Sequence, residues 1–288
     1  MNGITKTWKQ FLNFPLGARQ EKPREHGLTM VIDKGLGLGE TRDLLHLCSQ
    51  YIDFFKLAFG TPALYTPEVL EEKIQLVKSF GVEIYPGGTF LEVAIIQNRL
   101  AEYLHLAREF GFTAIEVSDG TITLDGEVRE KAVAMAAGLG FLVLTEVGKK
   151  DREERRTPLQ LARQIKEDLE HGAYRVILEG RDSGINAGIY DEQGRFLESE
   201  LEELLLAVAD PRFLIWEAPL KSQQQELILR FGPDVNLGNI PPHDVMALEA
   251  LRVGLRADTL KAVLGCRAEQ EDAGDLSLIS GPVLVTPA

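Results

Sequence analysis

The chain has 288 residues, of which 44% are hydrophobic and 26% are charged, and its formal net charge is −13 at pH 7. This length and hydrophobic content are sufficient for one large core. The acidic balance disfavours nucleic acid as a partner, since phosphate backbones are bound by basic surfaces; an anionic ligand would need a local basic cluster or a metal ion.

Membrane insertion and secretion are also disfavoured. The chain has no apolar run near the roughly 20 residues that a membrane-spanning helix needs, and its N-terminus lacks the apolar stretch of a signal peptide. Its two cysteines, Cys48 and Cys266, lie far apart and outside any C-x-x-C pair, which is typical of free thiols in a reducing compartment. We therefore expect a cytoplasmic protein without a membrane partner.

Residues 1–26 precede the first strand-like run and contain large apolar side chains at Trp8, Phe11, Leu12 and Phe14. We interpret them as an N-terminal arm that covers an apolar surface, either at the closed end of the barrel predicted below or on a neighbouring subunit. A homo-oligomer is therefore expected.

Eight short apolar runs follow, of the kind that forms buried strands in a parallel sheet. They cover Leu28–Asp33, Asp53–Phe59, Val82–Tyr85, Thr113–Val117, Phe141–Val147, Tyr174–Glu179, Phe213–Glu217 and Val235–Asn239. The segments between them are long enough for crossover helices, and helical patterns cover Pro67–Phe80, Gln97–Phe110, Val128–Gly138, Pro158–His171 and Gln223–Phe231. Eight such units over residues 27–268 predict a (β/α)8 TIM barrel, with an open doubly wound sheet as the alternative.

Two segments stand out from this regular pattern. The longest connection, from Gly180 to Pro211, predicts a turn-rich loop at the catalytic face followed by a helix over Glu198–Val208. Residues 269–288 fall outside the eight units, and we expect them to form a frayed C-terminal tail or a subunit contact.

Charged residues collect where the predicted strands end, which is where barrel enzymes have their active sites. The acids in these positions are Asp33, Glu116, Glu146, Glu179 and Glu217, and the bases are Lys56 and, from loops, Lys34, Lys149, Lys150 and Arg181. Because side chains alternate between the two faces of a strand, Lys56, Glu116 and Glu146 are predicted to point into the barrel. Buried carboxylates need a paired cation or a metal ion.

The residue types at these positions favour Mg²⁺. The five histidines form neither an H-x-H nor an HExxH pair, so zinc is disfavoured. Clustered carboxylates with room for water suit Mg²⁺. We predict its ligands among Glu116, Glu146, Glu179 and Asp33. Of the five acids, Glu217 is the one that we expect to be structural and not a ligand. A carboxylate–lysine network without a metal is the alternative.

Two glycine-rich loops are candidate ligand sites. The run Gly35–Gly39 has the spacing G-x-G-x-G after a charged strand end, which disfavours a dinucleotide site. The loop after the third strand offers free backbone N–H groups at Gly87, Gly88 and Thr89, which suit an anion. An ordinary tight turn is the alternative for this second loop.

Taken together, these motifs resemble the phosphosulfolactate synthase family. The resemblance is carried by Asp33-Lys34-Gly35, Asp53 with Lys56 and Gly60-Thr61, Tyr85-Pro86-Gly87-Gly88-Thr89, Glu116-Val117-Ser118-Asp119-Gly120, Leu144 to Lys150, Glu179 to Gly184, Glu217-Ala218-Pro219, and Val235 to Asn239. It extends from about residue 26 to residue 260 and includes every predicted strand. The arm and the segment after Lys261 look like additions, and Phe59 stands where a tryptophan is expected in archaeal members.

The resemblance implies an enzyme that adds sulfite to phosphoenolpyruvate in an Mg²⁺-dependent reaction. The product would be (2R)-phospho-3-sulfolactate, an early intermediate of coenzyme M biosynthesis. Sulfite would attack the methylene carbon and leave an enediolate, which a metal or fixed donors must stabilise. The candidates for binding the two anionic substrates are Lys34, Lys56, Gly87, Gly88, Thr89, Ser118, Arg181, Asn236 and Asn239.

Carbon 2 of the enediolate then needs a proton. We expect Lys150 to supply it, with a pKa lowered by the cations of Lys149, Arg181 and Lys56. Lys149 is the alternative acid, and Lys56 and Arg181 complete the catalytic candidates.

Two other functions stay open at this point. The first is a Schiff-base aldolase on the same barrel, with Lys149 or Lys150 as the amine. The second is a non-catalytic, stress-associated protein on an inherited barrel, against which the complete set of charged strand ends argues.

Overall fold

A computed structural model describes residue 8 and residues 11–151 and 154–272 of the chain. Its single sheet contains eight parallel strands: β1 (Thr29–Asp33), β2 (Phe54–Leu57), β3 (Glu83–Pro86), β4 (Ala114–Val117), β5 (Leu142–Val147), β6 (Arg175–Leu178), β7 (Leu214–Glu217) and β8 (Leu237–Ile240). The order β3-β2-β1-β8-β7-β6-β5-β4 places the first strand beside the last. Between β3 and β4, the Thr113 amide donates to the Ile84 carbonyl at 3.1 Å. The sheet thus closes, which confirms the (β/α)8 barrel, and the open-sheet alternative is wrong.

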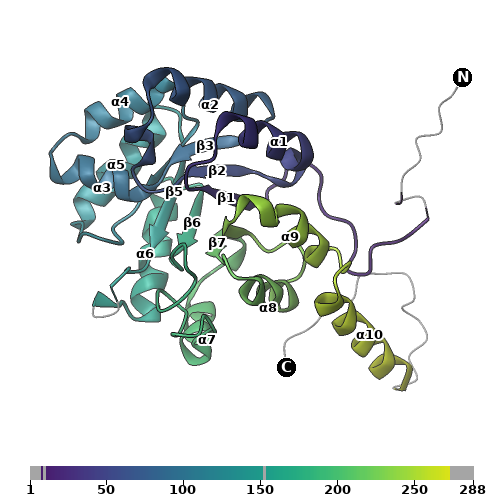
Figure 1. The fold of residues 1–288 in the computed structure, drawn as a ribbon. Helices are drawn as coiled ribbons and strands as arrows, with labels where there is room; N and C mark the ends of the chain where they lie inside the picture. The colour runs from purple at the N-terminus through teal and green to yellow at the C-terminus, as the bar shows by residue number, and fades with distance from the viewer. Residues whose placement is uncertain (1–7, 9–10, 152–153, 273–288) are drawn as a thin grey trace, which may run out of the picture.

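Helices follow one another around the barrel in chain order (Figure 1). They are α1 (Leu38–Cys48), α2 (Pro67–Ser79), α3 (Gly88–Ile96), α4 (Leu100–Phe110), α5 (Gly126–Gly138), α6 (Pro158–Glu170), α7 (Glu198–Ala207), α8 (Lys221–Phe231), α9 (Val245–Arg252) and α10 (Ala257–Asp272). Among the described residues, short 3₁₀ turns lie over Ser49–Tyr51, Thr61–Leu64, Pro211–Phe213 and Pro242–Asp244. Local sequence explains the start of α6, where Thr157 and Gln160 form a capping box and Pro158 is the first helical residue.

The core has two layers that the strand alternation separates. Alternate strand residues point into the barrel and fill its interior, where they form one cluster: Leu28, Met30, Phe54, Tyr85, Ala114, Leu144, Ile177 and Ile215. The other strand residues pack outward against the apolar faces of the helices. Each strand therefore sends its final inward-pointing residue to the carboxyl end of the barrel.

The described part of the N-terminal arm closes the opposite end of the barrel. The Leu16 amide donates to the Val253 carbonyl at 3.3 Å, Arg19 pairs with Glu249 at 3.0 Å, and Arg24 pairs with Asp53 at 3.2 Å. Earlier in the arm, the side chains of Trp8 and Phe11 are 79% and 76% exposed. Of the arm residues that the structure describes, the later ones therefore cover this chain, and the expected homo-oligomer stays a prediction.

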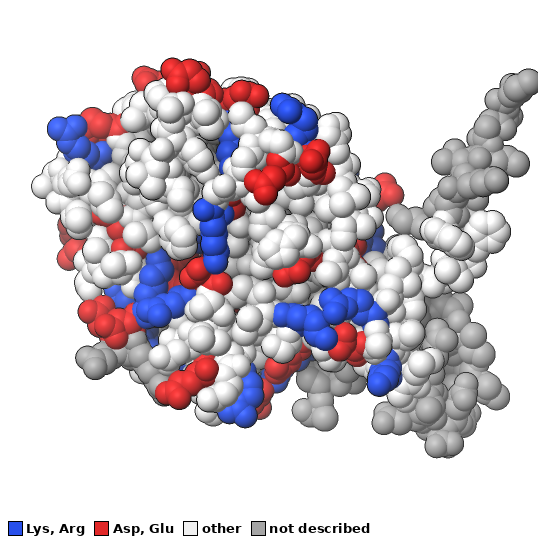
Figure 2. Space-filling model, viewed as in Figure 1, with Lys and Arg blue, Asp and Glu red and all other residues white. Residues whose placement is uncertain are grey.

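At the C-terminal end, α10 crosses residue 268, where the sequence analysis ended the barrel, and continues to Asp272. Figure 1 shows α10 and the N-terminal segment projecting from the same side of the barrel. The predicted tail beyond α10 lies outside the described residues. Within residues 11–151 and 154–272, no helix is long and apolar enough to cross a bilayer. The face seen in Figure 2 carries basic and acidic side chains close to one another.

Candidate active site

A cavity of about 420 Å³ opens at the carboxyl ends of the strands. Ten of the residues that the sequence predicted for the site line it: Lys56, Gly87, Gly88, Thr89, Glu116, Glu146, Lys150, Glu179, Arg181 and Asn239. Glu217 lines it too, together with Ile32, Phe59, Thr121, Asp182 and Ser183. The cavity therefore gathers side chains from strands or following loops all around the barrel.

The ammonium group of Lys56 lies at the centre of the buried acids. Its Nζ is 2.9 Å from Glu116 Oε2, 3.3 Å from Glu217 Oε1 and 3.5 Å from Glu146 Oε2. Burial lowers the pKa of Lys56, but the three carboxylates outweigh it and hold the pKa well above its usual value. The lysine is therefore charged, and it orients the acids from the floor of the cavity.

The carboxyl groups of Glu146, Glu179 and Glu217 form a candidate metal centre. Each offers an oxygen, and these oxygens lie within 4.8 Å of one another. Glu146 Oε1 and Glu179 Oε2 are buried and have no hydrogen-bond partner among the residues that the structure describes. Buried, unsatisfied carboxylate oxygens in a group of three are the ligands that a hard divalent cation prefers.

The acids of this cluster do not share their negative charge equally. Burial raises the pKa of Glu179 well above its ordinary value, and the neighbouring Glu146 and Glu217 carboxylates add to this effect. Burial also acts on Glu146, yet the cations of Lys56 and Lys150 outweigh it and lower its pKa. Without a metal, Glu179 therefore tends to keep a proton. A cation bound at this carboxyl group would displace that proton.

The candidate metal centre differs from the predicted ligand set at three acids, which are Glu217, Glu116 and Asp33. Glu217, which we regarded as the most structural acid, belongs to the cluster, and its Oε2 also accepts from the Gly180 amide at 2.9 Å. Glu116 instead pairs with Lys56 and accepts from the Gly88 amide at 2.7 Å, and burial raises its pKa to about 7. Glu116 therefore lies beside the cluster.

Asp33 lies outside the cavity because Ile32 is the last residue of β1 that points inward. Its Oδ1 accepts from the amides of Gly35 and Leu36 at 2.8 and 2.6 Å, and its Oδ2 pairs with Lys73 of α2. This carboxylate therefore fixes the loop after β1, in contrast to its predicted role as a ligand.

Lys150 reaches the cavity from the loop after β5. Its Nζ donates to Thr89 Oγ1 at 3.0 Å and lies 3.9 Å from Glu179 Oε2 and 4.0 Å from Glu146 Oε1. Burial lowers the pKa of Lys150, but these two carboxylates outweigh it and the pKa is raised. The expectation of a lowered pKa is therefore wrong for the metal-free protein, because the effect of the two carboxylates exceeds that of the Lys56 cation.

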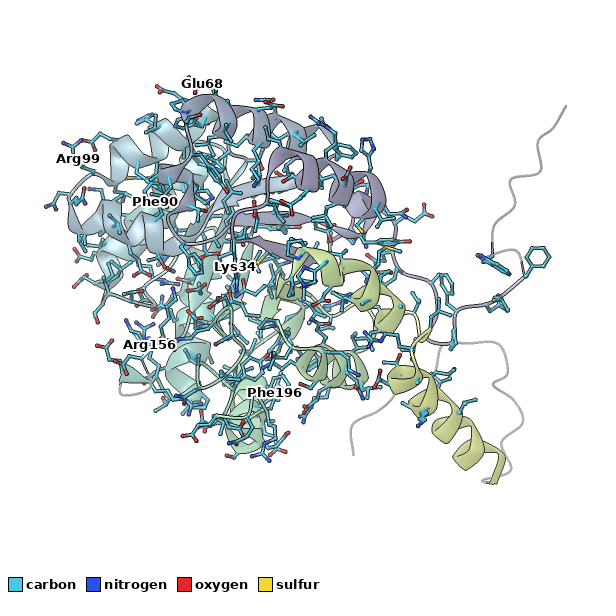
Figure 3. The ribbon with its side chains drawn as sticks, viewed as in Figure 1. Lys34, Glu68, Phe90, Arg99, Arg156 and Phe196 are labelled. Carbon is cyan, nitrogen blue, oxygen red and sulfur yellow. The ribbon has the colours of Figure 1, made fainter. Side chains whose placement is uncertain are left out.

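Neither Lys149 nor Lys34 lines the cavity. The Lys149 ammonium group is buried behind the loop after β4, where it donates to the carbonyls of Asp119 and Ile122, both at 2.6 Å. Lys34 lies near the centre of the ring of helices in Figure 3 and pairs with Asp182 at 2.7 Å. Asp182 lines the cavity, so this exposed ion pair stands at its rim.

Ser118 and Asn236, two predicted substrate contacts, are both occupied by the protein itself. The Ser118 hydroxyl donates to Glu92 Oε1 at 2.5 Å. The Asn236 amide group donates to the carbonyls of Arg212 and Leu214 and accepts from the Leu28 amide. Since Asn236 precedes β8, it lies at the closed end of the barrel, and Asn239 is the residue that the strand brings to the cavity.

The structure has the N-terminus of helix α3 where the sequence predicted a glycine-rich loop. Gly87 precedes the helix, and Gly88 and Thr89 begin it at the edge of the cavity. Gly88 has no room for a side chain, because a Cβ there would lie 2.5 Å from Ser118 Oγ and 2.7 Å from Glu116 Oε1. The close approach explains the glycine.

Backbone strain marks the rim of the same cavity. Phe59, Arg181 and Asn239 have φ angles of 57°, 60° and 52°, in the left-handed region that non-glycine residues seldom adopt. All three line the cavity, and such conformations concentrate at functional sites. The Asn239 Oδ1 atom is buried and lacks a hydrogen-bond partner within the described part of the chain.

Several site residues were missed by sequence reasoning: Gly120 and Thr121 of the loop after β4, Ser183, and Glu92 behind that loop. Glu217 was named among the strand-end acids but was left out of the predicted ligands, although it shares its strand face with Ile215 of the inner cluster. Glu92 gave no such signal, because it is an acid within an apolar helix.

A (β/α)8 barrel with buried acids, lysines and a helix N-terminus converging at the carboxyl ends of its strands is the active-site architecture of a barrel enzyme. Residues 17–258 match the family described as (2R)-phospho-3-sulfolactate synthase (ComA). The chain belongs to this phosphosulfolactate synthase family.

Three curated relatives carry the same name. The phosphosulfolactate synthase of Methanothermobacter thermautotrophicus is 47% identical over 247 residues, which cover 85% of this chain and 95% of the relative. Those of Methanocaldococcus jannaschii and Bacillus subtilis are 44% and 41% identical and cover 83% and 85% of this chain and 96% of each relative. The predicted family membership is thus confirmed, and an enzyme is supported.

Solved structures with lower sequence identity share the fold. The 3-hexulose-6-phosphate synthase of Salmonella typhimurium aligns with a TM-score of 0.52 at 16% identity, over 78% of this chain and 98% of its own. A dihydrodipicolinate synthase of Agrobacterium tumefaciens aligns with a TM-score of 0.51 at 13% identity, over 86% and 80%. At these identities the likeness concerns the barrel alone.

Proposed function

We propose that this protein catalyses the Mg²⁺-dependent addition of sulfite to phosphoenolpyruvate, giving (2R)-phospho-3-sulfolactate. The family and the names of the curated relatives support a phosphosulfolactate synthase. The observation that carries the proposal is the group of Glu146, Glu179 and Glu217, with its unsatisfied oxygens, beside the ammonium group of Lys150.

The charge balance of the cavity supports a bound cation. Four glutamates line it against two lysines and Arg181, while Asp182 is paired with Lys34 at the rim. With all four glutamates ionised, such a cavity would repel the anions phosphoenolpyruvate and sulfite, and a cation bound among the acids would remove this repulsion. Mg²⁺ would be held by Glu146, Glu179 and Glu217, and when bound it would supply stabilisation of the negative charge that develops on the substrate carboxylate.

The substrate phosphate has a suitable neighbourhood at the edge of the cavity. Thr89 lies in the first turn of α3, and the N-terminus of a helix favours negative charge. Arg181 presents a guanidinium group from the loop after β6. The Arg181 guanidinium donates to the Lys150 carbonyl, which ties the two loops together. In our proposal these groups hold the phosphate and leave the enol carbons toward the acids and Lys150.

The reaction balances with one proton from the protein. A sulfite sulfur lone pair forms the C–S bond at the methylene carbon, and the C=C electron pair moves to carbon 2 and its carboxylate. Carbon 2 then takes a proton from Lys150 Nζ, which the raised pKa keeps charged at the start of the step. Approach from the Lys150 side alone would set the configuration of the product.

The lysine contacts favour this proposal over a Schiff-base aldolase. An imine needs a neutral, accessible amine, but Lys149 donates to two carbonyls behind the loop. The pKa of Lys150 is raised by its acidic neighbours and that of Lys56 still more so. Borohydride treatment with a carbonyl substrate is therefore expected to leave the mass of the protein unchanged.

The direct test is incubation with phosphoenolpyruvate, sulfite and Mg²⁺. Mass spectrometry should detect phosphosulfolactate, and neither substrate alone should give it. A chain that consumes neither substrate under these conditions would contradict the proposed function.

Removing divalent cations is expected to abolish the activity, because the carboxylates then repel the substrates. Dialysis against a chelator should stop product formation, and added Mg²⁺ should restore it. The same protein should bind Mn²⁺, used as a probe, in a calorimetric titration without substrate. Full activity in excess chelator would exclude the metal from the reaction.

Replacement of Gly120 by alanine is expected to weaken cation binding. A Cβ at Gly120 would lie 3.1 Å from Glu179 Oε2 and 3.3 Å from Glu146 Oε1, against the two unsatisfied oxygens. We expect roughly 10–100-fold weaker Mn²⁺ affinity, the range for changes next to metal ligands. Gly126→Ala is the matched control, because a Cβ at Gly126 meets no described atom within 4 Å. Equal affinity in the two variants would argue against this position for the cation.

A further inference from the structure

The loop after β4, residues 118–122, forms one wall of the active site. Gly120 is its closest approach: a Cβ there would lie 3.1 Å from Glu179 Oε2 and 3.2 Å from Lys150 Cε. The Gly120 carbonyl also accepts from the Lys150 amide at 3.0 Å. The position of this loop therefore determines where Lys150 lies relative to the acids.

Two buried side chains of opposite charge hold the backbone of this loop. Glu92 of α3 accepts from Ser118 Oγ at 2.5 Å and from the amides of Thr121 and Ile122, both at 3.2 Å. On the other side, Lys149 donates to the carbonyls of Asp119 and Ile122, both at 2.6 Å. The acid thus binds the N–H groups of the loop and the lysine binds its carbonyls.

The side chain of Asp119 extends this hold to the strand that carries Glu146. Arg129 of α5 donates to Asp119 Oδ1 at 3.1 Å and to the Glu146 carbonyl at 2.9 Å. Asp168 of α6 fixes the guanidinium through two further hydrogen bonds of 2.8 and 2.6 Å. One buried network therefore connects the loop to the backbone of a candidate metal ligand.

We propose that Glu92 and Lys149 are positioning residues that clamp the loop 118–122 and so preorganise both the cation site and Lys150. The inference rests on the proposed function for its kinetic part alone. Lys149, a candidate for chemistry on sequence grounds, thereby acts through the loop, and Glu92 joins the site from behind it.

The cost of burying these charges supports a positioning role. A buried charge is unfavourable unless it is paired and hydrogen-bonded. Both side chains are buried, and the hydrogen bonds given above for each lead to the loop. Neighbours that orient metal ligands typically contribute 10–100-fold in metal affinity or activity.

The test compares Lys149→Met with Lys22→Met. Methionine keeps an unbranched side chain as far as the Cε position and removes the ammonium group with its three donors. Lys22 is a matched control, because it also donates to two backbone carbonyls, those of Ile52 and Gly81, but at the closed end of the barrel. Thermal unfolding shows that both variants fold and measures the stability that each loses.

Mn²⁺ titration without substrate is the readout that a merely structural lysine would not move. We expect Lys149→Met to bind Mn²⁺ about 10–100-fold more weakly, and Lys22→Met to bind it as the parent chain does. This arm gives a result even if the protein makes no phosphosulfolactate. Equal affinities in Lys149→Met and Lys22→Met would overturn the proposal.

The kinetic arm uses the Lys150→Ala background. The measurement is made at saturating Mg²⁺, so that weaker cation binding does not contribute. If Lys149 acts through the loop, Lys149→Met then lowers kcat by up to about 10²-fold in the parent chain and has little further effect when Lys150 is absent. An equally large loss in both backgrounds would mean that Lys149 acts independently, and would overturn the proposal.

Glu92→Gln provides a second, milder variant in case Lys149→Met does not fold. The amide keeps the shape but has one accepting oxygen in place of two, so the bonds from Ser118 and from the loop amides cannot all be kept. Weaker Mn²⁺ binding in the same direction supports the clamp, and parent-like Mn²⁺ binding together with parent-like kcat contradicts it.

Discussion

Lys150→Ala is expected to lower kcat by about 10²–10⁴-fold, the usual contribution of a general acid. The Lys150 ammonium group is within hydrogen-bonding distance of Thr89 and about 4 Å from two acids of the candidate metal centre. Its side chain lies in the cavity and not in the apolar core, so the fold should survive its loss. Steady-state kinetics with phosphoenolpyruvate and sulfite measure the effect.

Lys150→Arg separates proton donation from anion binding. A guanidinium group keeps the positive charge but does not readily release a proton, so kcat should fall here as well. If Lys150 only bound an anion, arginine would restore most of kcat and the main defect of the alanine variant would be in KM. Near-normal kcat in Lys150→Arg would therefore refute the acid role. Lys166→Ala, on the exposed face of α6, is a control for loss of a lysine.

Glu179→Gln is expected to abolish most cation binding and, with it, most activity. Its Oε2 is one of the unsatisfied buried oxygens, and an amide offers the cation no negative charge. Loss of a ligand should cost Mn²⁺ affinity at least the roughly 10–100-fold of a change in its surroundings. The matched control is Glu249→Gln, a buried acid that pairs with Arg19 at the closed end. Unchanged Mn²⁺ affinity in Glu179→Gln would exclude Glu179 as a ligand.

The same variant should make the metal-free protein more stable at neutral pH. The pKa of Glu179 is raised by burial and by its acidic neighbours, so folding favours its protonated form. The stability of the parent chain is therefore fully present below the unfolded pKa of a glutamate and is lost as the pH rises through the raised folded value. Glutamine stays neutral and avoids this loss. Thermal unfolding without metal should show a difference between the two proteins that grows with pH.

Sequence periodicity predicted the strand and helix bounds and the direction of side chains along the strands. The apolar run of β5 and the helical pattern of α2 were predicted to within a residue or so of their observed bounds, Leu142–Val147 and Pro67–Ser79. The inward directions of Lys56, Glu116 and Glu146 followed from alternation alone. These features depend on neighbours along the chain, so a single sequence contains them.

The surroundings of Asp33 and the start of α3 could not be predicted from periodicity. Asp33 lies at the end of β1, much as Glu179 lies directly after β6. The Asp33 side chain, however, points to the other face of its strand, toward Lys73 and away from the cavity. In the sequence, Gly87 and Gly88 resemble an ordinary turn. In the structure they lie at the start of α3, where Gly88 closely approaches Glu116 and Ser118. Both outcomes depend on contacts between segments distant in sequence.

The sequence by itself determined the eight-fold succession of strand and helix, the family, and the acids and lysines available at the strand ends, because these depend on local periodicity and residue type. Only the tertiary structure decided which charges meet. Closure of the barrel groups Glu217 with Glu146 and Glu179 and encloses Lys56 among three acids. It also separates the adjacent lysines, since Lys149 is held by the carbonyls behind the wall while Lys150 faces the cavity. Neighbours in the chain can thus have different roles, because a buried charge must go where the fold provides its partners.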